Sequence, residues 1–284
     1  MVTPLFKART NECCTRLVSK CNRDPMNNPF IIAQISDCHL FANSSLLHFG
    51  ANVYQNLLLV LSDIKKNSSI DIIIFTGDLT QDHSDKSYQL FTKAMSYCQI
   101  SIPVYFLSGN HDDPELLTKY LVGHSFCSSR VVENDYWQAL LVESKSKVIK
   151  GPAGQVDDIE FEQLHQRINI NKRQLLFMHH HPVDVGYFID KHGLNNRDEF
   201  WLNLDKYASI AGIACGHVHR GETMKSTSTN RSIDVYTCPA TSIQFDPLAS
   251  TVKALKQGPG YRLFTLFENG ELETSLHYPA DHLS

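Results

Sequence analysis

Short apolar runs alternate along the chain with segments whose apolar residues recur at helical spacing. Five runs rich in Ile, Val, Leu and Phe are too short for helices, and they predict buried strands at Phe30–Ile35, Ile70–Phe75, Ile102–Leu107, Gln174–Met178 and Ile210–Ala214. Helical periodicity between the runs predicts helices at Asn52–Lys66, Ser87–Tyr97, Asp157–Ile168 and Arg197–Tyr207. This alternation favours an α/β layered fold.

The pattern changes towards the carboxyl terminus, where strands follow one another without helices between them. They are predicted at Ser232–Thr237, Ser242–Phe245, Tyr261–Phe267 and Glu271–His277, separated by turn signals such as Asn269-Gly270. We expect these strands to complete a second sheet. With no internal repeat or low-complexity linker, the sequence predicts one domain over residues 29–284, preceded by a polar, mobile extension over residues 1–28.

The composition argues against several classes of protein. The chain has 284 residues, of which 42% are hydrophobic and 20% charged, as is typical of a soluble globular protein. Its net charge of −4 argues against a nucleic-acid partner or an anionic membrane surface. No apolar run is long enough to cross a membrane, and the amino terminus has no apolar signal region. Because the 8 cysteines form no CxxC pair, we expect free thiols and a cytoplasmic location.

Histidine is the one residue type that is unusually frequent, with 14 residues. Each of the five predicted buried strands is followed directly by residue types that bind metals, in the blocks Asp37-Cys38-His39, Gly77-Asp78, Gly109-Asn110-His111-Asp112, His179-His180-His181 and Gly216-His217-Val218-His219. In open α/β sheets the loops beyond the carboxyl ends of the strands form the binding crevice. Five parallel strands are therefore expected to gather these side chains around one point.

The residue types in these blocks fit a centre with two metal ions. Imidazole suits iron, manganese and zinc, and an aspartate can bridge two ions because it offers two oxygens. The D-x-H and H-x-H spacings place both side chains of each block on one face of an extended segment. Any single block could be an ordinary turn, cap or solvated pair. All five in this order, each at the end of a strand, predict a metal site.

The ordered set D-x-H, GD, GNHD, H and GHVH resembles the calcineurin-like metallophosphoesterase superfamily. Within it the chain is most similar to the bacterial class III 3′,5′-cyclic-AMP phosphodiesterases. The closer similarity rests on the strings HHHPVDVG at His179–Gly186, GLNNRDEF at Gly193–Phe200, IQFDP at Ile243–Pro247 and GPGYR at Gly258–Arg262. The resemblance implies a four-layer α/β fold, in which a two-sheet β-sandwich is flanked by helices.

The resemblance also implies how two metal ions per chain are held, with iron paired with manganese or iron, or with zinc in their place. One ion would have the ligands Asp37, His39 and His219, and the other Asn110, His179 and His217. Asp78 would bridge the two ions. His180 and His181 would then support the ligands rather than bind metal, unless the assignment within the three consecutive histidines is shifted.

The implied reaction is hydrolysis of 3′,5′-cyclic AMP to 5′-AMP by a hydroxide that bridges the two ions. His111 is the candidate general acid for the ribose 3′-oxygen, and Asp112 is expected to orient its ring. The phosphate is expected to contact Asn110, His111, His39 and His219. Aromatic residues that either stack on the base or pack in the core are Phe41, His48, Tyr187, Phe245 and Tyr261.

Other functions stay open on the sequence alone. The same centre could act on another phosphodiester, such as a 2′,3′-cyclic nucleotide, or on a phosphomonoester. A non-catalytic scaffold is disfavoured because every ligand position is filled. The expected partner is a small-molecule cyclic nucleotide, and the chain is expected to be a monomer or a homodimer. Cys38, between two ligands, is either a packed thiol that faces away from the ions, which strand alternation favours, or a redox-sensitive group.

Overall fold

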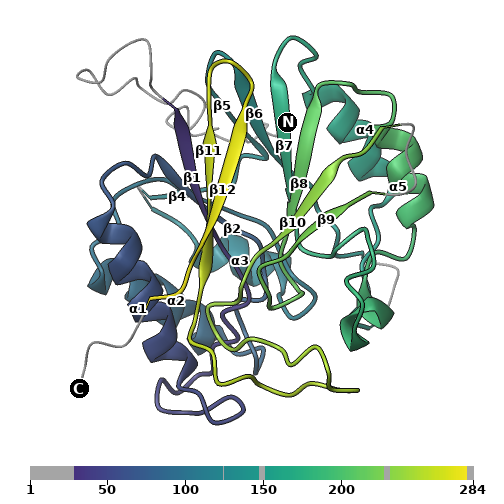
Figure 1. The fold of residues 1–284 in the computed structure, drawn as a ribbon. Coiled ribbons are helices and arrows are strands. Elements are labelled where there is room, and N and C mark those ends of the chain that lie inside the picture. The colour runs from purple at the N-terminus through teal and green to yellow at the C-terminus, as the bar shows by residue number, and fades with distance from the viewer. Residues whose placement is uncertain (1–28, 124, 147–150, 227–230, 280–284) are drawn as a thin grey trace, which may run out of the picture.

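The computed structural model of the chain describes residues 29–123, 125–146, 151–226 and 231–279. The predicted polar extension over residues 1–28 lies outside them. Two sheets of six strands form the centre of the described part (Figure 1). The chain thus has the two-sheet β-sandwich that its sequence implies.

The first sheet holds three of the five predicted strands side by side and in parallel. Its order is β12-β11-β1-β2-β3-β4, with β11 and β12 antiparallel to their neighbours. The bounds are Phe30–Ile35 for β1, Ile72–Phe75 for β2, Val104–Phe106 for β3, Phe126–Cys127 for β4, Tyr261–Leu266 for β11 and Leu272–His277 for β12.

The second sheet holds the other two predicted strands, again parallel to each other. Its order is β5-β6-β7-β8-β10-β9. The bounds are Val131–Glu133 for β5, Trp137–Leu141 for β6, Arg173–Met178 for β7, Ile210–Cys215 for β8, Thr223–Lys225 for β9 and Asp234–Thr237 for β10. The five strands that precede the metal-ligand blocks therefore lie in two facing sheets and not in one open sheet.

Helices cover the outer face of each sheet and complete four layers (Figure 1). The helices are α1 at Val53–Lys66, α2 at Asp85–Tyr97, α3 at Pro114–Tyr120, α4 at Asp158–Arg167 and α5 at Arg197–Leu204, with a 3₁₀ helix, η2, at Phe188–His192. One apolar cluster fills the space between the first sheet and α1–α3, a second lies between the sheets, and a third lies under α4 and α5. Along β2, Ile73 and Phe75 face the helices while Ile72 and Ile74 face the other sheet, as strand alternation requires.

Two predictions for the carboxyl-terminal part are wrong. β11 and β12 do not complete the second sheet but extend the first, with β11 paired to β1. Ser242–Phe245 is not a strand, although Phe245 forms an isolated bridge with Ala254. The main-chain carbonyls of this segment accept hydrogen bonds from side chains instead. The carbonyl of Ser242 accepts from the Asn56 amide, and that of Ile243 accepts from the ring of His219.

Two elements that the apolar pattern did not predict have signals in the sequence. Helix α3 begins with Asp113 as its N-cap, whose carboxylate accepts from the main-chain N–H groups of Glu115 and Leu116, and Pro114 fills the first turn. Strand β6 is buried at all five positions, which is typical of a strand inside a parallel sheet. Among the described residues, no helix combines the length and the apolar character needed to span a membrane.

Candidate metal centre

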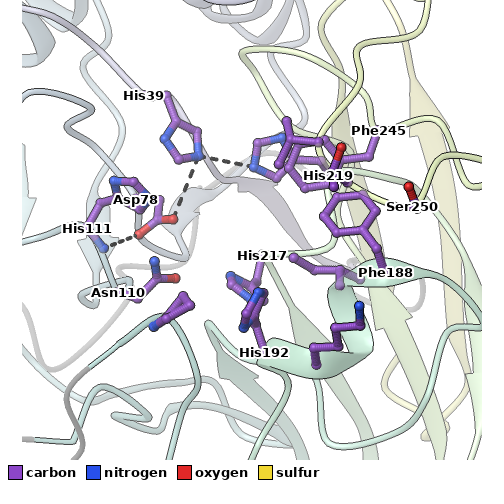
Figure 2. Close-up of a pocket in the computed structure, with 15 residues that line it drawn as sticks. His39, Asp78, Asn110, His111, Phe188, His192, His217, His219, Phe245 and Ser250 are labelled. Atoms are coloured by element: carbon purple, nitrogen blue, oxygen red, sulfur yellow. Dashed lines mark hydrogen bonds and ion pairs between the residues drawn. The ribbon is translucent and has the colours of Figure 1, made fainter.

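The side chains predicted as metal ligands meet where the carboxyl ends of the two sets of parallel strands converge. Of these side chains, Figure 2 shows His39, Asp78, Asn110, His217 and His219. The first sheet supplies Asp37, His39, Asp78 and Asn110, and the second supplies His179, His217 and His219. The two halves are joined directly, because the main-chain N–H of His217 donates to the Asp37 carboxylate at 3.0 Å. The gathering predicted from strand order is thus observed, across two sheets.

The loops that carry these side chains have an unusual backbone. Five non-glycine residues of the centre have left-handed backbone conformations, with φ of 55° at Asp37, 45° at His39, 58° at Asp78, 66° at His217 and 54° at His219. Such a conformation costs an L-residue about 1 kcal/mol or more, and it persists only where the surroundings impose it. Main-chain hydrogen bonds between the loops impose it here, such as His39 N–H to the carbonyl of Asp78 at 3.0 Å.

One group of donor atoms surrounds the end of β1. The Nε2 atoms of His39 and His219 lie 3.1 Å apart, and the Oδ1 atom of Asp37 lies 3.3 Å from His219 Nε2. All three residues are buried. Burial lowers the pKa of His39 to about 3, although the charge of Asp78 opposes the change. The imidazole is therefore neutral, as a metal ligand must be.

A second group lies beside the first and shares a carboxylate with it. His179 Nε2 lies 3.1 Å from Asn110 Oδ1 and 3.5 Å from Asp78 Oδ2. The same Oδ2 atom lies 3.7 Å from His39 Nε2 in the first group. His217 faces His179 with ring centroids 5.0 Å apart, and its Nε2 atom is buried with no hydrogen-bond partner among the described residues. Asp78 thus occupies the position between two donor groups that a bridging ligand needs.

Main-chain carbonyls fix the orientation of two of the imidazoles. Nδ1 of His179 lies 2.7 Å from the carbonyl of Thr76, and Nδ1 of His219 lies 2.8 Å from that of Ile243. A carbonyl only accepts, so each Nδ1 carries a proton and each Nε2 is the ring atom that faces the centre. Nε2 of His179 faces Asn110 Oδ1 at 3.1 Å. A proton or a metal ion on this Nε2 accounts for the contact, so the residues fit a metal ion.

The charges of the centre are coupled. Burial favours the neutral carboxyl of Asp78, yet the neighbouring His179 holds its pKa well below the usual range. Burial likewise opposes a charged His179, but Asp78 and Asp37 raise its pKa to about 9. Without an ion, a proton on His179 therefore balances the buried carboxylates. A metal ion competes with that proton for the same lone pair.

The middle histidine of the run has both ring nitrogens occupied by protein groups. Nδ1 of His180 lies 2.8 Å from Ser144 Oγ, and Nε2 lies 3.1 Å from the carbonyl of Pro152. No lone pair is left for an ion, in contrast to His179. This contact pattern favours His179 as the ligand of the three and a supporting role for His180.

A family model for calcineurin-like phosphoesterases matches residues 30–221, which carry all of the clustered side chains. The chain belongs to the calcineurin-like phosphoesterase family. The layered sandwich and the buried His/Asp clusters, which offer donor atoms within 4.8 Å of one another, agree with this membership.

Relatives of this phosphoesterase cover nearly its whole length. It is 51% identical to a "Probable cyclic nucleotide phosphodiesterase" of Colwellia psychrerythraea over 89% of the chain and 96% of that protein. It is 31% identical to the 3′,5′-cyclic adenosine monophosphate phosphodiesterase CpdA of Escherichia coli over 88% of the chain and 90% of that protein. The Vibrio vulnificus protein of the same name is 30% identical, over 88% of the chain and 90% of that protein.

Solved structures share the fold of the phosphoesterase at low sequence identity. A dimetal phosphatase from Danio rerio superposes with a TM-score of 0.57 at 13% identity, covering 90% of this chain and all of that one. A purple acid phosphatase from yellow lupin gives a TM-score of 0.61 at 14% identity, covering 89% of this chain and 52% of that one. At such identities the likeness establishes the four-layer fold.

The predicted contact between Asp112 and the ring of His111 is wrong. The Asp112 carboxylate accepts instead from the main-chain N–H groups of Asp78 at 2.7 Å, Leu79 at 2.8 Å and Gly109 at 2.9 Å. Burial, and then the charge of Asp78, raises its pKa to about 7. Asp112 therefore holds together the loops after β2 and β3, and it positions Asp78 and Asn110 rather than His111.

His111 itself lies at the wall of the cavity beside the metal centre. Its main-chain N–H donates to Asp78 Oδ1 at 2.8 Å, and its ring stacks on His83 with centroids 5.7 Å apart. Nδ1 of His111 has no partner among the described residues. The main chain on both sides is tied down by Lys145, whose Nζ atom donates to the carbonyls of Asn110 and Asp112. Lys145 follows β6, which the apolar pattern had not identified, so the sequence analysis missed it.

Cys38 lies in the core and points away from the centre. It belongs to the apolar cluster under α1–α3 and is fully buried, and this burial raises the pKa of its thiol. A packed thiol, the alternative that strand alternation favoured, agrees with this environment. Of the other described cysteines, Cys98, Cys215 and Cys238 are free as predicted, whereas Cys127 is disulfide-bonded.

Most of the aromatic residues considered as base-stacking candidates are used for packing. Tyr261 is buried and donates its hydroxyl to Asp63, and Tyr187 donates to the carbonyl of Val218. Phe245 is the exception because it lines a cavity of about 380 Å³ at the metal centre. The cavity is also lined by residues that the sequence analysis missed, from η2 and from the loop after Phe245, namely Phe188, Ile189, Lys191, His192, Ser250, Thr251 and Val252.

Proposed function

We propose that this phosphoesterase hydrolyses 3′,5′-cyclic AMP to 5′-AMP at a pair of metal ions. The proposed ligands are Asp37, His39 and His219 for one ion, Asn110, His179 and His217 for the other, and Asp78 between them. The single observation that carries the proposal is the position of Asp78, whose Oδ2 atom lies 3.5 Å from His179 Nε2 and 3.7 Å from His39 Nε2. The substrate is proposed from the cyclic nucleotide phosphodiesterases to which the chain is similar.

The protein's own groups have separable tasks in this reaction. Bound ions would supply charge neutralisation at the phosphate and a water of lowered pKa. The carbonyls of Thr76 and Ile243 keep His179 and His219 in the tautomer that presents Nε2. Asp112 and Lys145 hold the loop that carries Asn110. These groups are in place before a substrate arrives, which lowers the cost of organising the site.

His111 is the proposed general acid. It lines the cavity together with Asn110, Asp78 and His39, so a phosphate held at the metal centre lies next to it. Proton donation to the ribose 3′-oxygen as the P–O bond breaks would accelerate the reaction by about 10²–10⁴. The proposed phosphate contacts are Asn110, His111, His39 and His219, all of which line the same cavity.

The identity of the ions belongs to the proposal as well. A set of four imidazoles, two carboxylates and one amide suits iron with manganese, two irons, or zinc. We further propose that the enzyme acts on a small-molecule cyclic nucleotide in the cytoplasm, as a monomer or a homodimer.

The deciding experiment compares kcat/KM for cAMP, cGMP and 2′,3′-cyclic AMP, with the protein loaded separately with iron, manganese and zinc. We expect cAMP to be the preferred substrate with at least one metal, and 5′-AMP to be the sole product. A preference for 2′,3′-cyclic AMP by orders of magnitude would assign the same centre to a different phosphodiester. Absence of turnover in fully loaded protein would refute the proposal altogether.

A further inference from the structure

We propose that the wall of the cavity opposite His111 is the subsite for the nucleobase, and that Phe188 is the residue that recognises the base by stacking. This inference rests on the proposed function, because it assumes a cyclic nucleotide whose phosphate lies at the metal centre. It adds a specificity-determining residue on η2, which carries none of the proposed metal ligands.

The cavity has two chemically different sides. Asn110, His111 and Asp78 lie on one side, and Phe188, Phe245 and Ser250 lie on the other (Figure 2). Its volume of about 380 Å³ is within the range of small-molecule sites. A phosphate bound at the proposed metal centre would lie beside the polar side, so the rest of a substrate would extend towards the aromatic side.

Phe245 is the more firmly held of the two aromatic residues. Its ring stacks on that of His219 with centroids 3.9 Å apart and an interplanar angle of 6°, and only 6% of the residue is exposed. Phe188 packs against Phe245 at 5.2 Å with the rings inclined by 51°. Phe245 is thus a fixed backing that rests on a proposed metal ligand, while the half-buried Phe188 keeps part of its ring turned to the cavity.

Helix η2 is anchored so that this ring is in place without substrate. The Asp190 carboxylate accepts from the main-chain N–H groups of Val185 and Gly186, each at 2.8 Å. It also pairs with His181 Nε2 at 3.3 Å, and the His181 ring stacks over His217 at 5.8 Å. The last histidine of the run therefore connects the metal centre to the helix that carries Phe188. A wall that is already ordered before the substrate arrives loses little conformational entropy when a flat ring binds to it.

The chemistry of this wall fits a nucleobase better than a small alkyl phosphodiester. A base has an apolar face and a polar edge, and aromatic side chains bind such faces by offset stacking. Around the aromatic pair stand Lys191, which only donates hydrogen bonds, and Ser250 and Thr251, whose hydroxyls donate or accept. Groups of this kind can form hydrogen bonds with the edge of a base, which an alkyl group does not offer.

The test combines truncation of the residue with truncation of the substrate. Phe188→Ala and Phe188→Leu are compared with the unsubstituted enzyme on cAMP and on the 3′,5′-cyclic phosphate of 1-deoxyribose, which has no base. Stacking is worth roughly tenfold in binding, so we expect kcat/KM for cAMP to fall about tenfold in both variants. We expect kcat/KM for the abasic compound to stay within about twofold. Where its turnover is too slow, its inhibition constant against cAMP hydrolysis is compared instead.

Leu248→Ala is the matched control, since Leu248 is 94% exposed on the loop after Phe245 and does not line the cavity. The metal content of each variant is measured to confirm that the centre is intact. Equal losses on both substrates, or no loss on either, would overturn the role of Phe188 while leaving the proposed function standing. Failure of the unsubstituted, metal-loaded enzyme to hydrolyse cAMP would instead refute the proposed function.

Discussion

His111 and Asp112 are adjacent in the chain, yet their surroundings divide two roles between them. The ring of His111 lines the cavity, whereas the carboxylate of Asp112 is buried among main-chain N–H groups behind it. One residue faces the substrate, and the other holds the loops that place Asp78 and Asn110. Substitutions at the two positions should therefore fail in different ways.

His111→Ala is expected to lower kcat by about 10²–10⁴ while both ions stay bound, because the proposed general acid is lost and no proposed ligand changes. Metal analysis together with steady-state kinetics on cAMP checks this. His39, Asp78 and His111 also form a group that could hold an ion. Loss of one metal ion from the variant would mean that His111 is a ligand, and the acid role would then be wrong.

Asp112→Asn is expected to destabilise the protein by about 1–3 kcal/mol, because the amide nitrogen would face a main-chain donor and leave it without an acceptor. Metal retention should weaken as well, since the loop with Asp78 loosens. Urea unfolding and metal titration measure the two effects.

Asp113→Asn is the control for this substitution. Asp113 caps α3, and asparagine caps a helix equally well, so little change is expected. Equal behaviour of the two variants would contradict the positioning role of Asp112.

The residues of the centre differ in how far the sequence could identify them. The five blocks were identified because each stands at a strand end, a local signal that does not require knowledge of the fold. The choice of ligands within the blocks came from the family resemblance. Asp112 was predicted to contact the ring of its neighbour His111, but adjacency in the chain does not show in which direction a buried carboxylate points. Phe188 gave no such signal, because its neighbours Tyr187 and Ile189 are also apolar or aromatic and the sequence does not show which of them faces the cavity.

At the scale of elements, the centre depends on how closely the strand ends approach one another. A Cβ atom on Gly77, after β2, would lie 2.3 Å from the main-chain nitrogen of Gly109, after β3. One on Gly216, after β8, would lie 2.1 Å from Ser36 Oγ, at the end of β1. Glycine at these positions lets the loops of both sheets meet, because any side chain would collide with the neighbouring loop.

Gly77→Ala is expected to cost about 2 kcal/mol or more, since Gly77 has a φ of +96° and no room for a methyl group. Activity should fall with stability, because Asp78 is the next residue. Gly258→Ala serves as the comparison, as the nearest atom to its Cβ would be 3.7 Å away. Thermal unfolding and cAMP turnover of the two variants are compared; a Gly77→Ala protein that matches Gly258→Ala in both would show that the loops can separate.

The elements themselves were predictable where periodicity decides them. Helix α1 was identified from its apolar face, and its observed N-cap is Asn52, the first residue of the predicted segment. The assignment of β11 and β12 to the second sheet failed because strand pattern carries no information about which sheet edge is free. Only the packing of β11 beside β1 decides it.

At the scale of the whole molecule, each of the two sheets supplies one side of the proposed metal centre. Asp37, His39, Asp78 and Asn110 come from the first sheet, and the remaining proposed ligands come from the second. Bound ions would therefore connect two halves of the fold that also meet through the central apolar cluster and through the hydrogen bond from His217 to Asp37. Metal binding should consequently contribute to global stability as well as to turnover.

Removal of metal by a strong chelator is expected to abolish turnover and to lower Tm. An ion present at 100 times its Kd stabilises a folded protein by about 2.7 kcal/mol, which corresponds to roughly 5–10 °C for a chain of this size. Calorimetry with and without manganese, iron or zinc measures the shift. An Asp78→Asn variant should show a smaller shift, and an unchanged Tm on metal removal from the native protein would contradict a centre shared between the sheets.

Left-handed backbone conformations lower the stability of the folded state at five residues that the proposed reaction needs, namely Asp37, His39, Asp78, His217 and His219. Glycine would adopt these backbone angles with less strain, but it has no side chain to supply the proposed donor atoms. The protein without ions therefore carries this strain uncompensated, and the binding of ions would offset it.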